Sequence, residues 1–184
     1  PFMKNKKIWL FEDRLDFADD SARQLFEFSS KKDDGISKYF VIGGDSEDYA
    51  LMRTKHKNVV KFNSFKHKLL YFFAEKNISS YVNENFINPF YNFNPSLSCG
   101  LLNSQRYFLQ HGVTKDDVSL FINGLIKRLS LILTVSDFER DSFLSDFYNF
   151  DSQEVQVLGF PRYDKLNNEN LKQQILFSPT WRLG

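Results

Sequence analysis

The sequence has little or none of several features, and each shortage excludes a class of protein. Its 184 residues include one cysteine, Cys99, so no disulfide can form within the chain and no cysteine pair can hold zinc. No apolar run approaches the roughly eighteen residues that cross a bilayer, and the N-terminus has no signal-peptide core. A net charge of +1 gives no overall field to attract nucleic acid. We therefore expect a cytoplasmic protein that does not bind nucleic acid.

Cofactor-binding and nucleophile motifs are also missing. The chain has no glycine-rich dinucleotide fingerprint, no P-loop and no Gly-x-Ser-x-Gly nucleophile elbow. Its three histidines are scattered, and His56 and His67 lie among lysines, where a solvent-facing role is expected. The sequence thus predicts neither a cofactor nor a metal.

What the chain does have is typical of one globular domain. Hydrophobic residues make up 42% and charged residues 26%, and the length suffices for a single core. The 21 phenylalanines and 8 tyrosines indicate a bulky aromatic interior. Pro1 and Phe2 precede Met3, and we interpret residues 1–2 as a remnant of an expression vector.

Short apolar runs alternate with helical patterns along the whole chain. This alternation predicts an α/β fold, a Rossmann-like parallel sheet with helices on both faces. Between the fourth and fifth expected strands, residues 83–104 have no clear period and predict a loop with a short helix near Phe90. The expected strands are residues 7–11, 38–42, 59–62, 79–82, 106–110, 131–135, 155–158 and 175–178. The expected helices are residues 19–30, 46–53, 64–73, 120–128, 136–148 and 166–173.

A polar stretch at residues 167–174 suggests a domain boundary. We expect residues 3–170 to form the Rossmann-like domain and residues 171–184 to be the start of a second, truncated domain.

His111 is the best single candidate for chemistry. It follows an expected buried strand, and ligands of open α/β sheets bind where strands end at their carboxyl edge. An imidazole is an effective general base at neutral pH, and Gly112 beside it lets the backbone turn and a ligand approach. A histidine that only hydrogen-bonds its own loop is an equally good interpretation of the local sequence.

Other polar side chains follow the expected strands. Lys115 and Asp116 could bind a phosphate or polyol hydroxyls, or simply solvate their loop. Ser136 begins a helix whose N-terminus could hold a phosphate, although a capping box with Glu139 explains both residues. Arg162 could clamp a phosphate or pair with Asp164. The basic stretch from residue 53 to residue 68 fits an anionic acceptor, a membrane surface or an ordinary solvated face.

Several motifs, taken together and in order, resemble the CDP-glycerol glycerophosphotransferases, the teichoic acid polymerase family. The Pro-Thr-Trp-Arg run is the most specific of them, and His-Gly carries that family's proposed base. One departure is that Val113 separates His-Gly from Thr114 and Lys115. The motifs are residues 11–21 with Arg14, Gln110-His111-Gly112, Thr134-Val135-Ser136, Gly159-Phe160-Pro161-Arg162-Tyr163-Asp164, and residues 175–182 with Pro179-Thr180-Trp181-Arg182.

The resemblance implies the N-terminal, acceptor-side domain of a GT-B architecture. It implies transfer of glycerol or ribitol phosphate from CDP-glycerol or CDP-ribitol to a hydroxyl of a lipid-linked cell-wall or capsular polymer. His111 would be the base, and CMP would leave. The substrate-binding residues would be Arg14, Gly112, Thr114, Lys115, Asp116, Ser136, Arg162 and Asp164. Donor-binding residues would lie mainly in the second domain, so this part alone is expected to be inactive.

Two other functions stay open at this point. One is the N-terminal half of a GT-B nucleotide-sugar glycosyltransferase or epimerase. The other is a non-catalytic interaction domain that keeps a Rossmann-like core. The expected location is the cytoplasm, where the protein could also bind the inner face of the cell membrane.

Overall fold

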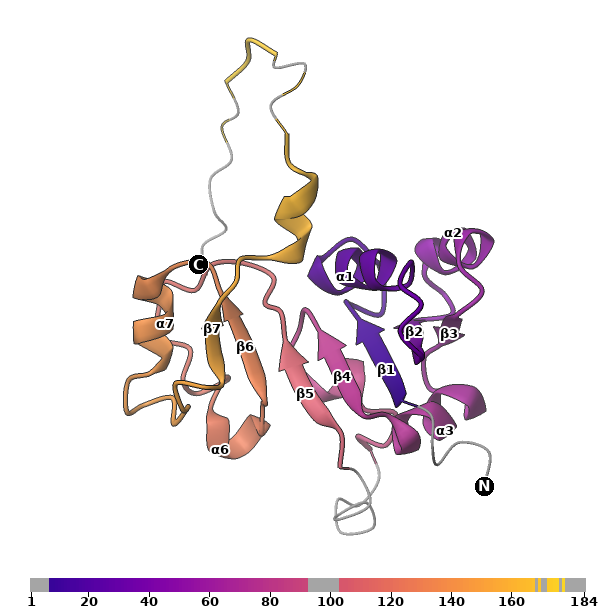
Figure 1. Cartoon of the computed structure of the whole chain (residues 1–184), viewed down its shortest axis with the longest axis horizontal. Helices are drawn as coiled ribbons and strands as arrows, with labels where there is room; N and C mark the ends of the chain where they lie inside the picture. The colour runs from indigo at the N-terminus through magenta and orange to yellow at the C-terminus, as the bar shows by residue number, and fades with distance from the viewer. Residues whose placement is uncertain (1–6, 93–102, 168, 170–171, 176, 178–184) are drawn as a thin grey trace.

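The computed structural model describes residues 7–92, 103–167, 169, 172–175 and 177. In this part of the chain seven strands form one sheet in the order β3-β2-β1-β4-β5-β6-β7, and every neighbouring pair is parallel (Figure 1). The predicted α/β fold class is confirmed. The strands are β1 (Lys7–Glu12), β2 (Ile36–Ile42), β3 (Val59–Lys61), β4 (Lys76–Ser79), β5 (Gln105–Phe108), β6 (Leu131–Thr134) and β7 (Val155–Val157).

The helices begin where the sequence offers capping side chains. Ser46, Ser64 and Ser136 each accept a hydrogen bond from a backbone N–H of the helix that comes next, which satisfies a donor that would otherwise have no partner. Among the described helices, none has the length and apolar character that a bilayer crossing requires. The helices are α1 (Ser21–Ser29), α2 (Glu47–Lys55), α3 (Phe65–Phe73), α4 (Glu84–Ile87), α6 (Gly124–Lys127), α7 (Asp137–Phe143) and the 3-10 helix η1 (Pro161–Lys165).

Helices cover both faces of the sheet because consecutive strand residues point to opposite sides. Phe11 and Phe40 pack with Phe26 of α1 and Met52 of α2 on one face. The other face carries two clusters. One packs Leu10 against α3, and the second forms around α7.

The strand order changes direction between β1 and β4. From β1 the chain winds outward to β2 and β3, then returns to add β4 to β7 on the other side. In open parallel sheets the crevice at such a switch point, outside the carboxyl ends of the strands, is where ligands bind. The loops after β1 and β4 are therefore the part of the fold that positions a site.

Several expected boundaries were wrong. The fourth strand is β4 at Lys76–Ser79 instead of residues 79–82, and the short helix after it is α4, which ends before Phe90. The helix expected at 120–128 is reduced to α6, because Asn123 has an extended backbone and caps the helix by accepting a hydrogen bond from the Leu125 N–H. The next residue, Gly124, packs so closely on Asn149 that an added Cβ would lie 2.1 Å from its carbonyl oxygen. A left-handed Arg128 then ends α6.

The C-terminal part also differs from the prediction. Helix α7 ends at Phe143 and not at residue 148, and Phe143 packs edge-on against Tyr148, whose segment folds back under the helix. The expected loop at 159–164 contains η1, because Pro161 presets the backbone of its first turn. The described residues of the helix expected at 166–173 are not helical. In the strand expected at 175–178, Ile175 and Phe177 are described and are not in a strand, whereas residues 176 and 178 lie outside the described residues. Cys99 and residues 179–184 also lie outside them.

The prediction that His67 faces solvent was wrong. Its side chain is fully buried, because α3 turns His67 toward the sheet with Leu70 while Lys66 points outward. The Nδ1 atom of His67 accepts a hydrogen bond from the backbone N–H of Asn63 at 3.1 Å, and Nε2 lies 3.6 Å from a carboxylate oxygen of the buried Glu12. Burial lowers the pKa of His67 to about 3 and raises the pKa of Glu12 well above its usual range.

Candidate functional site

Side chains from three strand ends meet at the switch point. Asp13 follows β1, Ser80 and Tyr81 follow β4, and His111 lies just beyond β5. The Ser80 hydroxyl donates to an Asp13 carboxylate oxygen at 2.6 Å, and the His111 ring contacts the Ser80–Tyr81 segment. His111 thus lies at the carboxyl edge of the sheet, where the sequence predicted it.

The His111 imidazole is held in one orientation by two contacts. Its Nδ1 atom lies 3.3 Å from the carbonyl oxygen of Ser80. Its ring stacks on the ring of Tyr81, with 4.5 Å between centroids and 9° between planes. A carbonyl oxygen only accepts hydrogen bonds, so the contact favours the tautomer with the proton on Nδ1. That tautomer leaves the Nε2 lone pair free to accept a proton from a ligand.

A buried carboxylate fixes the loop that carries His111. Glu139, on α7, accepts hydrogen bonds from the backbone N–H groups of Thr114 at 2.7 Å and Val135 at 2.9 Å. The side-chain amide of Gln110 donates to the same carboxylate at 3.3 Å and to the Leu133 carbonyl at 2.5 Å. The loops after β5 and β6 are therefore tied together through one carboxylate.

The same network explains the local backbone. Gln110 adopts a left-handed conformation with φ of 58°, which costs energy for a residue with a Cβ. Its side-chain contacts offset that cost, and the Thr114 hydroxyl adds a further hydrogen bond to Gln110 at 3.0 Å. The left-handed residue of this turn is therefore Gln110, and Gly112 is not in that conformation. A Cβ on Gly112 would meet no atom within 4 Å, so the backbone beside His111 is open to a ligand.

Asp13 occupies the N-terminus of α1. Its carboxylate accepts hydrogen bonds from the backbone N–H groups of Asp20 at 3.0 Å and Ala22 at 3.1 Å, as well as from Ser80. Burial raises the pKa of Asp13 to about 6 even though these hydrogen bonds favour the ionised form. The contact joins the ends of β1 and β4 to the start of α1, directly beneath the segment on which His111 stacks.

The two predicted arginines lie at the same edge but have protein partners. Arg14 makes a bidentate ion pair with Asp16, at 2.9 Å and 3.0 Å. Burial raises the pKa of the Tyr81 hydroxyl, and the charge of Arg14 offsets part of that rise. Arg162 lies 3.4 Å from Asp20, the N-cap residue of α1, and does not form the alternative pair with Asp164. Through Arg162, η1 contacts the helix that begins at the switch point.

The remaining predicted residues are spread along this edge. The Ser136 hydroxyl accepts a hydrogen bond from the Glu139 N–H at 3.3 Å and so acts as the cap of α7. Lys115 and Asp116 are exposed on the loop after His111. Asp164 lines a separate cavity of about 280 Å³ between α1 and η1. Within the described ranges, no group of three or more His, Cys, Asp or Glu side chains could hold a metal ion.

Sequence reasoning missed the residues that support His111. Tyr81 and Ser80 lie thirty residues upstream, and only the pairing of β4 with β5 brings them under the imidazole. Glu139 was noticed as a capping residue, but its contact with Thr114 had no signal in the sequence.

Comparisons with known proteins place the chain in a family and match its fold. The profile of the family described as CDP-Glycerol:Poly(glycerophosphate) glycerophosphotransferase matches residues 1–183. The chain is 39% identical over 177 residues to the minor teichoic acid biosynthesis protein GgaB of Bacillus subtilis (strain 168), covering 96% of this chain and 19% of GgaB. The wall teichoic acid polymerase TagF has a similar structure, with a TM-score of 0.54 at 15% identity over 86% of this chain and 39% of TagF. A TagF variant soaked with CDPG gives a TM-score of 0.55 at 17% identity over 89% of this chain and 41% of that one.

The chain corresponds to a part of each of these relatives. It spans about a fifth of the length of GgaB and about two fifths of the TagF chains. At such identities the likeness to TagF shows a shared fold, and it is the profile match and GgaB that show the relationship. The chain belongs to the CDP-glycerol:poly(glycerophosphate) glycerophosphotransferase family.

Proposed function

We propose that the full-length protein transfers a polyol phosphate from a CDP-activated donor, CDP-glycerol or CDP-ribitol, to a hydroxyl of a lipid-linked cell-wall or capsular polymer. In this proposal residues 3–170 form its acceptor-side domain, and residues 171–184 begin the second domain. Membership of the family supports the reaction class, and the names of GgaB and TagF link those relatives to teichoic acid synthesis.

The observation that carries the proposal is the orientation of His111. Its Nδ1 is engaged with the Ser80 carbonyl, its ring is supported by Tyr81, and its Nε2 is directed away from both contacts. A base that must take a proton from an acceptor hydroxyl needs this arrangement of one fixed and one free nitrogen. Ligands of open parallel sheets bind outside the carboxyl ends of the strands, and the proposal assigns the acceptor hydroxyl to this place beside His111.

In the proposed reaction, the acceptor oxygen forms a bond to the β-phosphorus of the donor. The bond between that phosphorus and the bridging oxygen of the diphosphate breaks, and CMP leaves with that oxygen. His111 Nε2 takes the proton of the attacking hydroxyl. Such general base catalysis contributes roughly 10²–10⁴-fold to the rate. The product is the acceptor lengthened by one polyol phosphate.

The other predicted site residues are assigned to substrate in this proposal. Gly112 leaves open space beside the base, and Lys115 with Asp116 follows it on an exposed loop. Arg162 could turn from Asp20 to a phosphate, since the contact is long and the arginine partly exposed. The remaining assignments are Arg14, Thr114, Ser136 and Asp164.

A membrane surface is proposed as the place of this reaction. Helix α3 exposes 82% of Phe65 beside the exposed Lys66, a pairing of aromatic and cationic side chains that suits an anionic lipid interface. Co-sedimentation of the full-length protein with anionic vesicles should fall for Phe65→Ser and Lys66→Glu. Equal sedimentation of wild type and variants would remove α3 from membrane attachment.

The reaction is tested by product release from the full-length protein. CMP should appear from CDP-glycerol or CDP-ribitol in the presence of a polymer acceptor. Release of UDP or GDP from nucleotide sugars would support the glycosyltransferase alternative, and no release from any donor would support an interaction domain. We expect residues 1–184 alone to give no turnover, because the resemblance assigns the donor site to a second domain.

A further inference from the structure

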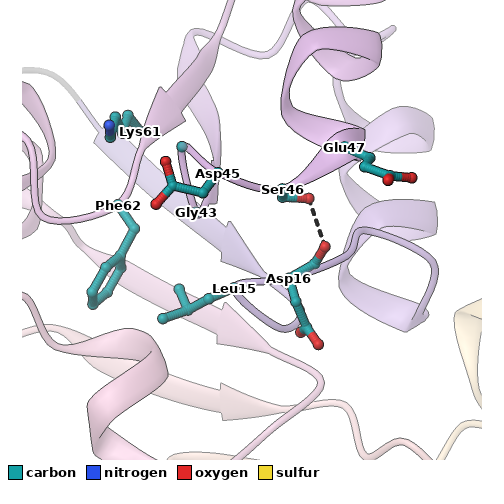
Figure 2. A pocket seen from close by; sticks show the side chains of 9 residues that line it. Leu15, Asp16, Gly43, Asp45, Ser46, Glu47, Lys61 and Phe62 are labelled. Carbon is teal, nitrogen blue, oxygen red and sulfur yellow. Dashed lines mark hydrogen bonds between the residues drawn. The ribbon is translucent and has the colours of Figure 1, made fainter.

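A second cavity opens at the same edge of the sheet, on the other side of the switch point from His111. It lies among the loops that come after β1, β2 and β3, and its volume is about 470 Å³, within the usual range for small-molecule sites (Figure 2). Among the residues that line it are Leu15, Asp16, Asp45, Glu47, Lys61 and Phe62.

The charged groups of this cavity are available to a ligand. Among the residues that the structure describes, the side chains of Asp45, Glu47 and Lys61 form no ion pair and no hydrogen bond. Leu15 and the half-buried Phe62 add an apolar wall, and Figure 2 shows the Asp45 carboxylate on the same side of its loop as Phe62. Carboxylates that accept from hydroxyls, a cation and an apolar wall together suit a hydroxylated ligand that carries a phosphate.

Two glycines shape the cavity. A Cβ on Gly43 would lie 2.4 Å from the carbonyl oxygen of Leu15, so only glycine lets the loops after β1 and β2 approach this closely. A Cβ on Gly44 would lie 2.6 Å from the Lys61 amine and 2.2 Å from the carbon beside it. Because Gly44 has no side chain, the Lys61 side chain can pack directly against the backbone of this loop.

The cavity is connected to the His111 region by Arg14. This arginine binds both carboxylate oxygens of Asp16, which lines the cavity, and its charge acts on the Tyr81 hydroxyl. Tyr81 in turn stacks on His111. The two places thus lie along one continuous edge, with Arg14 and Tyr81 between them.

We propose that this cavity binds a preceding unit of the acceptor chain, a phosphate-bearing polyol or sugar, while the terminal hydroxyl of that chain lies at His111. Asp45 and Glu47 accept hydrogen bonds from the hydroxyls of the unit, and Lys61 pairs with its phosphodiester. Asp16 is already paired with Arg14, and the two remaining carboxylates, Asp45 and Glu47, outnumber Lys61. This excess of negative charge disfavours the higher charge of a nucleoside diphosphate, so the cavity does not fit the donor. This assignment deepens the proposed function and rests on it for the role of the bound unit.

Binding can be measured without turnover. We suggest titrating the full-length protein, by calorimetry, with glycerol phosphate oligomers of one, two and four units, with a sugar phosphate oligomer, and with CDP-glycerol. Asp45→Asn and Lys61→Ala should each weaken binding of the longer oligomers about tenfold, since each removes a charged hydrogen-bonding group. Binding of the single unit and of CDP-glycerol should not change.

Matched controls are available outside the cavity. Asp33→Asn and Lys32→Ala remove the same charges from exposed positions outside the cavity and should leave all affinities unchanged. Gly44→Ala tests the cavity by a second route, because it displaces Lys61 without removing it, and should weaken the longer oligomers as well. Thermal unfolding of each variant confirms that it is folded.

The outcomes separate the two proposals. Selective loss of oligomer affinity supports the subsite even if no CMP is released from any CDP-polyol, a result that would overturn the proposed reaction alone. Three results would each overturn the subsite. The cavity variants could bind the oligomers as well as the controls do, the wild type could bind no oligomer, or the cavity variants could bind CDP-glycerol more weakly. Comparison of the polyol and sugar oligomers identifies which repeat the cavity takes.

Discussion

The rings of Tyr81 and His111 lie 4.5 Å apart and almost parallel, although the two residues come from the ends of different strands. Adjacent parallel strands place their carboxyl ends side by side, and β4 and β5 use this to put an aromatic platform under an imidazole. The carbonyl oxygen next to the platform, that of Ser80, contacts the ring at Nδ1. Ring plane and tautomer are thus set by one short segment after β4.

Replacement of Tyr81 should therefore affect turnover through the orientation of His111. In the full-length protein, Tyr81→Phe keeps the stacked ring and should retain kcat near the wild-type value. Tyr81→Ala removes the platform and should lower kcat roughly two- to tenfold, the worth of an aromatic pair. The KM for the donor should not move. Equal kcat values for the two variants would show that stacking does not position the base.

Removal of the imidazole itself should have a larger effect. His111→Ala should lower kcat of the full-length protein by roughly 10²–10⁴-fold, the usual contribution of a general base. Because His111 is exposed, the melting temperature should stay close to that of the wild type. His56→Ala is the control for turnover, since this histidine ends α2 away from the proposed site; it packs on Phe26, so a loss of stability is expected of it alone. Unchanged turnover in His111→Ala would remove it from the mechanism.

The carboxylate of Glu139 should be needed for both stability and turnover. Glu139→Gln replaces one acceptor oxygen with an amide NH₂, which would then face the N–H of Thr114 or Val135. A buried donor without an acceptor costs about 1–3 kcal/mol, so the free energy of unfolding should fall by that amount in urea titrations. Turnover should fall too, because the loop after Gln110 loses its anchor.

Asp137→Asn provides the comparison for that experiment. It lies in the same helix and pairs with Arg140, but its side chain is 73% exposed. Exposed ion pairs contribute up to about 1 kcal/mol, and the loops after β5 and β6 do not depend on this one. A loss of stability in Asp137→Asn as large as that of Glu139→Gln would contradict the role assigned to the buried carboxylate.

The fold was predictable because the apolar runs, the helical patterns and the capping residues all indicated the same alternation of strands and helices. Apolar runs such as residues 131–135 gave the strands, and serines before helical patterns gave the caps. The position of His111 at the carboxyl edge followed from the same pattern. Its environment did not, because Tyr81 reaches it through strand pairing and Gln110 is held in an unfavourable backbone conformation by distant partners. The prediction for His67 was wrong because its neighbours in the sequence are lysines, which suggest a solvent-facing side chain, whereas His67 points toward the sheet.

Two buried groups should give the stability of the protein a pH dependence of opposite sign. The folded pKa of His67 is lowered from 6.5 to about 3, so its contribution is present above pH 6.5 and is lost as pH falls toward 3. The folded pKa of Asp13 is raised from 3.8 to about 6, so its contribution is complete below pH 3.8 and is lost as pH rises through 6. Between these limits the two effects oppose each other, and Glu12, with a raised pKa, acts in the same sense as Asp13.

Variants can separate these contributions. His67→Phe removes the titrating ring, so its free energy of unfolding relative to wild type should improve as pH falls from 6.5, by up to about 1.4 kcal/mol per pH unit. Asp13→Asn should show the reverse trend, with its stability relative to wild type improving as pH rises from 4 to 6. Urea unfolding followed by circular dichroism at half-unit pH steps measures both slopes. Parallel curves for wild type and His67→Phe would mean that burial does not hold the His67 ring neutral.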